Sequence, residues 1–117
     1  MAEVRNVNKG VKLTTTSATN LYAAPNHVRS RVGTMAFINT GGSDSTFTLD
    51  WVDKADSSST SSTQVYKIFK DKSVKAGKSV ILDLNLVLEK QDILRATASA
   101  ANVFEVSLSI EEKSIQQ

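Results

Sequence analysis

The chain of 117 residues contains no cysteine, one proline and one histidine. The absence of cysteine excludes disulfide bonds, thiolate zinc sites and cysteine nucleophiles. The lone His27 cannot form a two-histidine metal site, and a catalytic triad would need a serine and an acid arranged around it. His27 follows Pro25 and Asn26, so we expect an exposed imidazole in a turn. These absences disfavour an enzyme.

Long apolar runs and a strong charge of one sign are also missing. No segment approaches the ~20 apolar residues that a membrane-spanning helix needs. The start, Met1–Asn6, has no apolar region typical of a secretory signal, so we expect synthesis in the cytoplasm. The net charge is +2, and apart from Arg29 and Arg31 the cationic residues are scattered among acidic ones. This pattern predicts neither a nucleic-acid nor a membrane partner.

The acidic and glycine-rich segments lack the rest of any catalytic or ligand-binding motif. Asp50, Asp53 and Asp56 lack the glycine and terminal glutamate of a calcium loop, which indicates the acidic rim of a hairpin. Gly41–Gly42 has no P-loop lysine and no following helix. Glu111–Glu112 would point to opposite faces of a strand, which excludes a paired acid–base role. The sequence therefore predicts no catalytic, cofactor-binding or metal-ligating residues.

Alternation of apolar and polar residues is the main signal that is present. Between Thr46 and Asp53, the apolar side chains Phe47, Leu49 and Trp51 fall at every second position. Side chains of a strand point alternately to opposite faces, so this segment predicts a half-buried strand. Aromatic residues make up only 6% of the chain, and a small core needs them. We therefore expect Trp51 to anchor a core between two sheets.

Similar segments recur along the whole chain. The strands expected from alternation and turn residues cover 11–15, 20–24, 28–40, 46–53, 64–70, 79–84, 93–99 and 104–110. A spacing of ~8–12 residues between turns is typical of sandwiches and barrels. The sequence thus predicts an all-β protein: a single antiparallel β-sandwich, Ig-like or jelly-roll, of about eight short strands. A helix over 82–91 is the weaker alternative.

The longest expected strand, 28–40, has apolar residues on both faces and therefore predicts a central position in its sheet. Strict alternation places Val32 with Thr34, Ala36 and Ile38 on one face, and Arg31 with Met35, Phe37 and Asn39 on the other. Gly41–Asp44 offers positive-φ positions for a tight turn, which predicts a hairpin with the Trp51 strand.

The ends and the longest loop are polar. We expect residues 1–10 to form an N-terminal arm, 11–112 the β-sandwich domain and 113–117 a C-terminal tail. At ~3.3 Å per extended residue, the arm is long enough to reach a neighbouring subunit. The segment Lys54–Thr63 is polar and rich in serine, so we expect it to form a mobile loop. Lysines at positions 67, 70, 72, 75 and 78 would discourage uncontrolled pairing along one sheet edge.

Three segments resemble one family. Lys12–Pro25, with its Leu-Thr-Thr-Thr and later Tyr-Ala-Ala-Pro, resembles the opening of small β-sandwich accessory virion proteins of tailed bacteriophages, many from marine and cyanobacterial phages. Val32–Gly42 with Thr46–Val52 is similar to that family's central hairpin, and Leu86–Ser99 to its closing pattern. The resemblance covers residues 11 to 110. The chain departs from it at Gln91, where the family usually has glycine.

The resemblance implies a non-enzymatic structural component of a tailed-phage virion, present in many symmetric copies. Its partners would be further copies of itself and other virion proteins of the capsid, the head–tail connector or neck, or the tail. The family offers no catalytic residues to carry over. The alternative is a receptor- or glycan-binding module of a fibre or adhesin that uses Tyr66 and the loops 39–44 and 53–63. The sequence does not choose between head, neck and tail.

Overall fold

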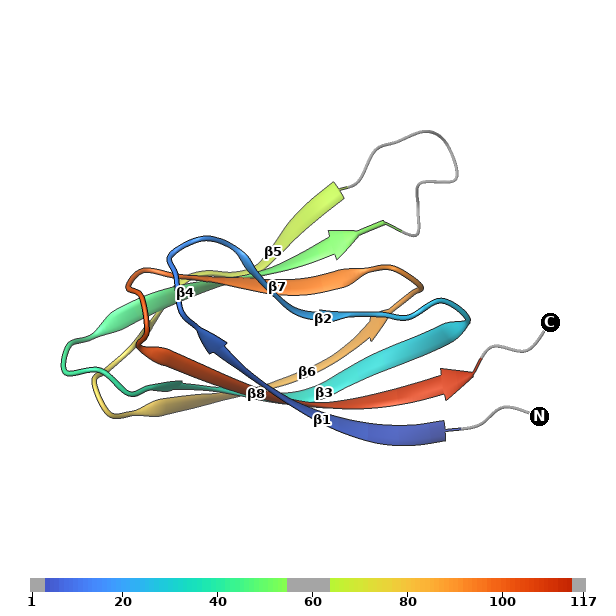
Figure 1. Ribbon diagram of the computed structural model, residues 1–117, viewed down its shortest axis with the longest axis horizontal. Coiled ribbons are helices and arrows are strands. Elements are labelled where there is room, and N and C mark those ends of the chain that lie inside the picture. Colours follow the sequence, from blue (N-terminus) through green and yellow to red (C-terminus); the bar gives the residue numbers. More distant parts are fainter. Residues whose placement is uncertain (1–3, 55–63, 115–117) are drawn as a thin grey trace.

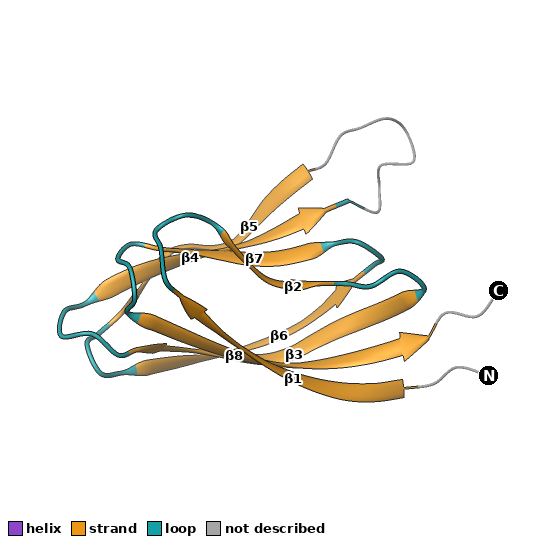
Figure 2. Cartoon of the chain, in the orientation of Figure 1, coloured by secondary structure: helices purple, strands orange, loops and turns teal. Residues whose placement is uncertain are grey.

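The computed structural model describes residues 4–54 and 64–114, and in these ranges it confirms an all-β sandwich. The eight strands are β1 (Val4–Leu13), β2 (Thr19–Ala23), β3 (Val28–Asn39), β4 (Ser45–Asp53), β5 (Gln64–Val74), β6 (Ser79–Leu88), β7 (Ile93–Ala98) and β8 (Phe104–Ser114). Short loops join most of them (Figure 2). Across the described part of the chain, no helix has the length and apolar character to cross a membrane. Residues 82–88 lie in β6, so the helical alternative for 82–91 is wrong.

The strands form two four-stranded antiparallel sheets, ordered β1-β8-β3-β6 and β2-β7-β4-β5. Figure 1 shows these sheets as two layers. The first half of the chain pairs with the second half in reverse: β4 with β5, β3 with β6, β2 with β7 and β1 with β8. A long hairpin rolled up so that its successive strand pairs alternate between two sheets is a jelly roll. The topology thus favours the jelly roll over the Ig-like alternative.

A cluster of phenylalanines joins the two layers at the centre of the core. The rings of Phe37 and Phe47 stack with their centroids 3.7 Å apart, and Phe104 meets both edge-on. All three side chains are at most 1% exposed. Because Phe37 and Phe104 belong to one sheet and Phe47 to the other, the cluster ties the layers together. We call these three residues the phenylalanine cluster.

The first strand begins earlier than the sequence suggests. Residues 4–10, expected to be an arm, pair with β8 in an unbroken register from Val4 opposite Lys113 to Leu13 opposite Phe104. The reason is that β1 is an edge strand, most of whose side chains are exposed. Only Val7, Val11 and Leu13 pack on the core. Such a strand carries little alternation for the sequence to reveal.

The predicted hairpin between 28–40 and the Trp51 strand is wrong. β3 and β4 lie in different sheets, so residues 40–44 cross from one layer to the other. Gly41 and Gly42 have no positive φ, unlike Gly77 at +73° in the turn between β5 and β6. The buried Asn39 holds the crossover: its Nδ2 donates to the carbonyls of Ser43 (2.8 Å) and Val74 (3.0 Å), and its Oδ1 accepts from the Gly41 amide (2.9 Å).

Neighbouring glycines in this crossover should respond differently to a methyl group. A Cβ at Gly41 would lie 2.9 Å from Cγ1 of Val103, whereas one at Gly42 would meet nothing within 4 Å. We expect Gly41→Ala to lower the free energy of unfolding by about 1–3 kcal/mol. Gly42→Ala should leave it unchanged or raise it by up to about 1 kcal/mol. Urea unfolding measures both, and equal effects would contradict the crossover geometry.

A bulge in β3 corrects the expected division of its faces. The pairing of β3 with β8 shifts between Val32 and Met35. Val32 therefore joins Met35 and Phe37 on the core face, while Ala36 and Ile38 lie on the outer face. The expected central position is confirmed, since β3 lies between β8 and β6.

The departure from the family pattern at Gln91 coincides with a special backbone conformation. Gln91 has a φ of 70°, in the left-handed region that glycine adopts at no steric cost. Its amide donates to the carbonyl of Ala24 at 2.8 Å, which ties the turn 89–92 to the end of β2. The turn therefore adopts the conformation that a glycine would favour. The Ser-rich stretch 55–63 lies outside the described residues.

Candidate functional site

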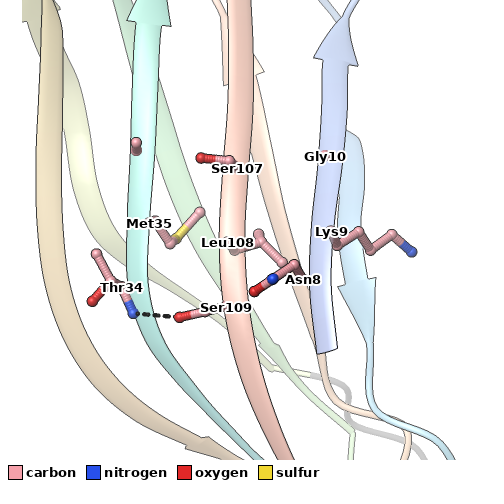
Figure 3. A pocket seen from close by; sticks show the side chains of 9 residues that line it. Asn8, Lys9, Gly10, Thr34, Met35, Ser107, Leu108 and Ser109 are labelled. Atoms are coloured by element: carbon pink, nitrogen blue, oxygen red, sulfur yellow. Dashed lines mark hydrogen bonds between the residues drawn. The ribbon is translucent and has the colours of Figure 1, made fainter. Parts of the chain in front are cut away.

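The outer face of the sheet that contains β3 carries two adjoining hollows, of about 460 and 440 Å³. They share Gly10 of β1, Ala36 of β3 and Ser107 of β8, and together we call them the trough. Figure 3 shows the first hollow, with Asn8, Lys9 and Ser109 around it. Its remaining lining residues are Thr34, Met35 and Leu108; the second hollow adds Val11, Lys12, Ile38, Glu105 and Val106.

Strand register explains the trough. Gly10 lies opposite Ser107, Ser107 opposite Ala36, and Ala36 opposite Ile81 of β6, so three small residues form a row that ends in a large one. Residues opposite each other on adjacent strands stand side by side on the same face. Small side chains there leave the outer face low, which accounts for the hollows.

The chemistry of the first hollow suits contact rather than reaction. Its polar groups are hydroxyls, an amide and one lysine; among its described lining residues none is acidic or a histidine. The Ser109 hydroxyl accepts from the Thr34 amide at 3.4 Å, beside the β3 bulge. Without an adjacent base, a serine hydroxyl is a weak nucleophile. The first hollow is therefore a candidate surface for packing against another protein.

Exposed apolar side chains border the trough on one side. Ile81 is 66% exposed and Ile38 is 39% exposed. Both lie on the same outer face, because Ile81 is opposite Ala36 and Ile38 is opposite Ser79. Large apolar side chains at such exposure are unremarkable singly, but next to a shallow trough they extend an apolar surface.

Trp51 lies at the margin of the core, and the phenylalanine cluster takes the central place expected for it. Its half-buried ring packs against the core and stacks on Tyr66, with centroids 5.2 Å apart. The indole N–H of Trp51 donates to the buried carboxylate of Asp92 at 3.2 Å. The same carboxylate also accepts hydrogen bonds from the backbone amides of Lys54 and Glu89. Trp51 therefore stiffens this end of the sandwich. Tyr66, 48% exposed, presents the open ring of the pair.

The other residues singled out from the sequence have ordinary surroundings. His27 is exposed in the turn between β2 and β3, as predicted, with a φ of 64°. Asp50 is buried and paired with Lys67 (3.4 Å) and Arg95 (3.5 Å). Asp56 lies outside the described residues. Within 4–54 and 64–114, no group of three or more His, Cys, Asp or Glu side chains is placed to hold a metal ion.

A buried polar cluster that sequence reasoning missed involves Glu112. Glu111 is exposed and Glu112 buried, which confirms their opposite orientation. The Glu112 carboxylate accepts from Nε of Arg5 (3.0 Å) and from the Tyr22 hydroxyl, and the Tyr22 oxygen also contacts the Ser30 hydroxyl (2.8 Å). We call Arg5, Tyr22, Ser30 and Glu112 the Glu112 cluster. It links β1, β2, β3 and β8 at one end of the sandwich.

The Glu112 cluster shifts the proton affinity of two of its members. Burial alone would raise the pKa of Glu112, but hydrogen bonds from Tyr22 and Arg5, with the charge of Arg5, hold that pKa below its usual value. Burial, and then the bond to the Glu112 carboxylate, raise the pKa of Tyr22 to about 12. At neutral pH the cluster therefore contains a carboxylate that accepts hydrogen bonds from a neutral phenol and a guanidinium.

No protein-family model and no curated protein sequence matches the chain. Among solved structures, a chain of the T13 particle of infectious bursal disease virus has a TM-score of 0.58 at 12% identity, over 97% of this chain and 31% of the viral one. A chain from the acid-stable capsid structure of Helicobacter pylori bacteriophage KHP30 has a TM-score of 0.52 at 11% identity, over 99% and 95% of the two chains.

A third similar structure is not viral. A chain of the disulfide-linked pili that form Bacillus endospore appendages has a TM-score of 0.53 at 10% identity, over 99% of this chain and 89% of that one. The chain thus spans about a third of the bursal disease virus chain but most of the other two. At these identities the likeness shows a shared fold, the β-sandwich described above.

Proposed function

We propose that this protein is a non-enzymatic structural component of a tailed-phage virion, which oligomerises and attaches to capsid, head–tail connector, neck or tail proteins. The observation that carries the proposal is the likeness to a chain of the phage KHP30 capsid structure, because that likeness covers 99% of this chain and 95% of the phage chain. The segments Lys12–Pro25 and Leu86–Ser99, which resemble tailed-phage accessory virion proteins, support the same class.

The surfaces support assembly. The trough and the adjacent Ile38 and Ile81 form a shallow, partly apolar area without acid–base chemistry in its first hollow. Assembly through such an area needs shape and apolar contact and no ligand. The similar pilus chain also belongs to an assembly, the disulfide-linked pili of the endospore appendages. This chain has no cysteine, so it cannot be linked to its neighbours in that way.

The structure changes what the N-terminus can contribute. Residues 4–9 pair with β8, so they are unavailable as a free arm that reaches a neighbour. Removing Met1 to Lys9 would delete much of β1 together with Arg5 of the Glu112 cluster, and the truncated chain should be destabilised. Attachment is therefore better assigned to faces and edges of the sandwich than to an arm.

The glycan-binding alternative now depends on Tyr66. Trp51, which would have extended an aromatic platform, has its indole N–H bound to Asp92 and one face covered by Tyr66. A single exposed ring makes a small stacking surface. The virion proposal is therefore preferred.

Mass spectrometry of purified particles tests the proposal. Phage particles released by cells that carry this gene are purified on a density gradient, washed in high salt and quantified peptide by peptide. We expect the chain at a fixed ratio to the major capsid protein before and after the wash, since apolar contacts resist salt. A non-structural phage protein measures carry-over. If the chain is present only at the carry-over level, it is not a virion component.

A further inference from the structure

One edge of the sandwich differs from the other three. The edge strands are β1 and β6 in one sheet and β2 and β5 in the other. Unpaired backbone groups along an edge template the addition of another strand unless charges, prolines, bulges or short length prevent it. Of the four edges, β6 has the weakest protection.

The other edges carry such devices. β5 has lysines at positions 67, 70 and 72, as expected, and two shifts in its register with β4. β2 is only five residues long and is followed by Pro25. β1 carries Arg5, Lys9 and Lys12. By contrast, β6 has no lysine, arginine or proline in its ten residues, and its one charge is Asp83.

The first half of β6 is regular and ends at an irregularity. Ser79 to Asp83 pair residue by residue with Ile38 to Thr34 of β3, and the register shifts only beyond Asp83. Asn85, with a φ of 50°, lies in that irregular part. The segment 79–83, which we call the β6 edge, is therefore regularly paired with β3 on one side and lies at the edge of the sheet on the other.

Side chains of β6 are incompletely covered. Val80, Leu84 and Leu86 of β6 pack on the core but remain partly exposed, and Ile81 is 66% exposed on the outer face. β5, joined to β6 by the turn at 75–78, leaves Ile68 and Phe69 partly exposed as well. The flank of the sandwich beside the β6 edge therefore has partly exposed apolar side chains on both sheets, and an added strand would bury more of their surface.

The β6 edge is complementary to itself in one register. An antiparallel pair about a two-fold axis through Ile81 places Ile81 opposite Ile81 of a second copy, Val80 opposite Leu82, and the hydroxyl of Ser79 opposite the carboxylate of Asp83. Opposite residues then share a face, as antiparallel pairing requires. A centre at Asp83 would oppose two carboxylates, and a centre at Leu82 would oppose Asp83 with Ile81. The register centred on Ile81 avoids both costs, and it pairs the whole of segment 79–83 with itself.

We infer that β6 pairs with β6 of a second copy of this chain, antiparallel and centred on Ile81, so that the two sheets become one. The interface is isologous, because the same patch serves both copies. The inference rests on the proposed function, which needs contacts between copies, and it names the strand that makes them. The trough lies next to this edge on the same outer face and stays open for other virion proteins.

Cysteine crosslinking of the full chain tests the pairing and its register. Because the native chain has no cysteine, each variant carries one thiol. Residues directly opposite in a sheet have Cβ atoms ~4.5–5.5 Å apart, so Ile81→Cys should give covalent dimers on oxidation or with a short bis-maleimide. Ser79→Cys alone should not, because its own copy lies four residues away, about 13 Å along the strand. Mixed Ser79→Cys and Asp83→Cys chains should crosslink.

Val65→Cys is the matched control, since Val65 is 43% exposed on the protected β5 edge. It measures crosslinking by random collision. If Ile81→Cys crosslinks no faster than Val65→Cys, or if Ser79→Cys alone crosslinks as fast, the inferred pairing is overturned.

Sedimentation velocity over a concentration series gives an independent test. We expect the native chain to self-associate, Ile81→Lys to raise the dissociation constant at least ~10-fold, and Val65→Lys to leave it unchanged. Circular dichroism verifies that both variants are folded. A native chain that stays monomeric throughout, or an Ile81→Lys variant that associates normally, overturns the inference. If the chain is found in particles but Ile81→Cys gives no crosslinks, this interface is refuted and the virion role stands. If Ile81→Cys crosslinks but the chain is not incorporated into particles, the virion role is refuted and the interface stands.

Discussion

Replacing Phe37 with alanine is expected to lower the free energy of unfolding by about 3–5 kcal/mol, the usual cost of deleting a buried phenylalanine ring. Phe37 has no exposed surface, stacks on Phe47 and meets the edge of Phe104. Its removal would leave a cavity between the two sheets, where the phenylalanine cluster packs. Since a small domain is stable by only about 5–15 kcal/mol, the loss is a large share of the total. Urea unfolding at neutral pH measures it.

Tyr66→Ala is the matched control, because it also deletes an aromatic ring. Tyr66 is 48% exposed, and Trp51 is the ring on which it stacks within the described residues. Its removal should cost about 1 kcal/mol, the typical value of an aromatic pair beyond burial. Similar losses in the two variants would mean that the phenylalanine cluster is not the structural centre of the sandwich. Phe37→Leu, which fills part of the space, should fall between them.

The general architecture was predictable because apolar residues alternate where both sheets face the core. In β4, Phe47 and Leu49 are two positions apart and both are buried. In β8, every second residue from Phe104 to Ile110 is buried, as a period of two requires. The same reasoning failed at β1, whose edge position lets polar residues stand on most sites. It failed again at the β3 bulge, since one inserted residue reverses the face of everything beyond it.

Pairing between strands was less predictable than the strands themselves. The glycines at 41 and 42 suggested a hairpin, yet this connection crosses from one sheet to the other. The residue that holds the crossing loop is the buried Asn39, through hydrogen bonds to Ser43 and Gly41. The Glu112 cluster was also hidden. Arg5 and Tyr22 are 107 and 90 residues from Glu112 in sequence, so only the pairing of β1 with β8 and the stacking of the sheets bring them together.

The stability of the protein should depend on pH through the Glu112 cluster in two separate ranges. The folded-state pKa of Glu112 is lowered from the ordinary value of 4.5, so its contribution is complete above that value and is lost as the pH falls through the folded-state pKa. The pKa of Tyr22 is raised from 10.0 to about 12, so its contribution is complete below pH 10.0 and is lost as the pH rises toward about 12. Melting temperatures across the pH range measure both.

Two variants assign these ranges to residues. Glu112→Gln should remove the acidic contribution and lower the pKa of Tyr22, since the carboxylate is one of the causes that raise it. Tyr22→Phe should abolish the alkaline contribution and move the acidic one to higher pH, because Glu112 loses a hydrogen bond that lowers its pKa. Each should cost about 1–3 kcal/mol at neutral pH, the price of leaving a buried polar group without its partner.

Glu111→Gln is the control that makes the comparison decisive. Glu111 is the adjacent residue on the same strand, but it points outward, and among the described residues its ion pair is an exposed one with Arg31 at 3.9 Å. An exposed pair contributes ~0–1 kcal/mol. Other carboxylates titrate in the same acidic range, so the informative quantity is the difference between each variant and the native protein. If the difference curves of Glu111→Gln and Glu112→Gln coincide, the buried cluster does not govern acid stability. If they separate below pH 4.5, burial and the bonds from β1 and β2 are the cause.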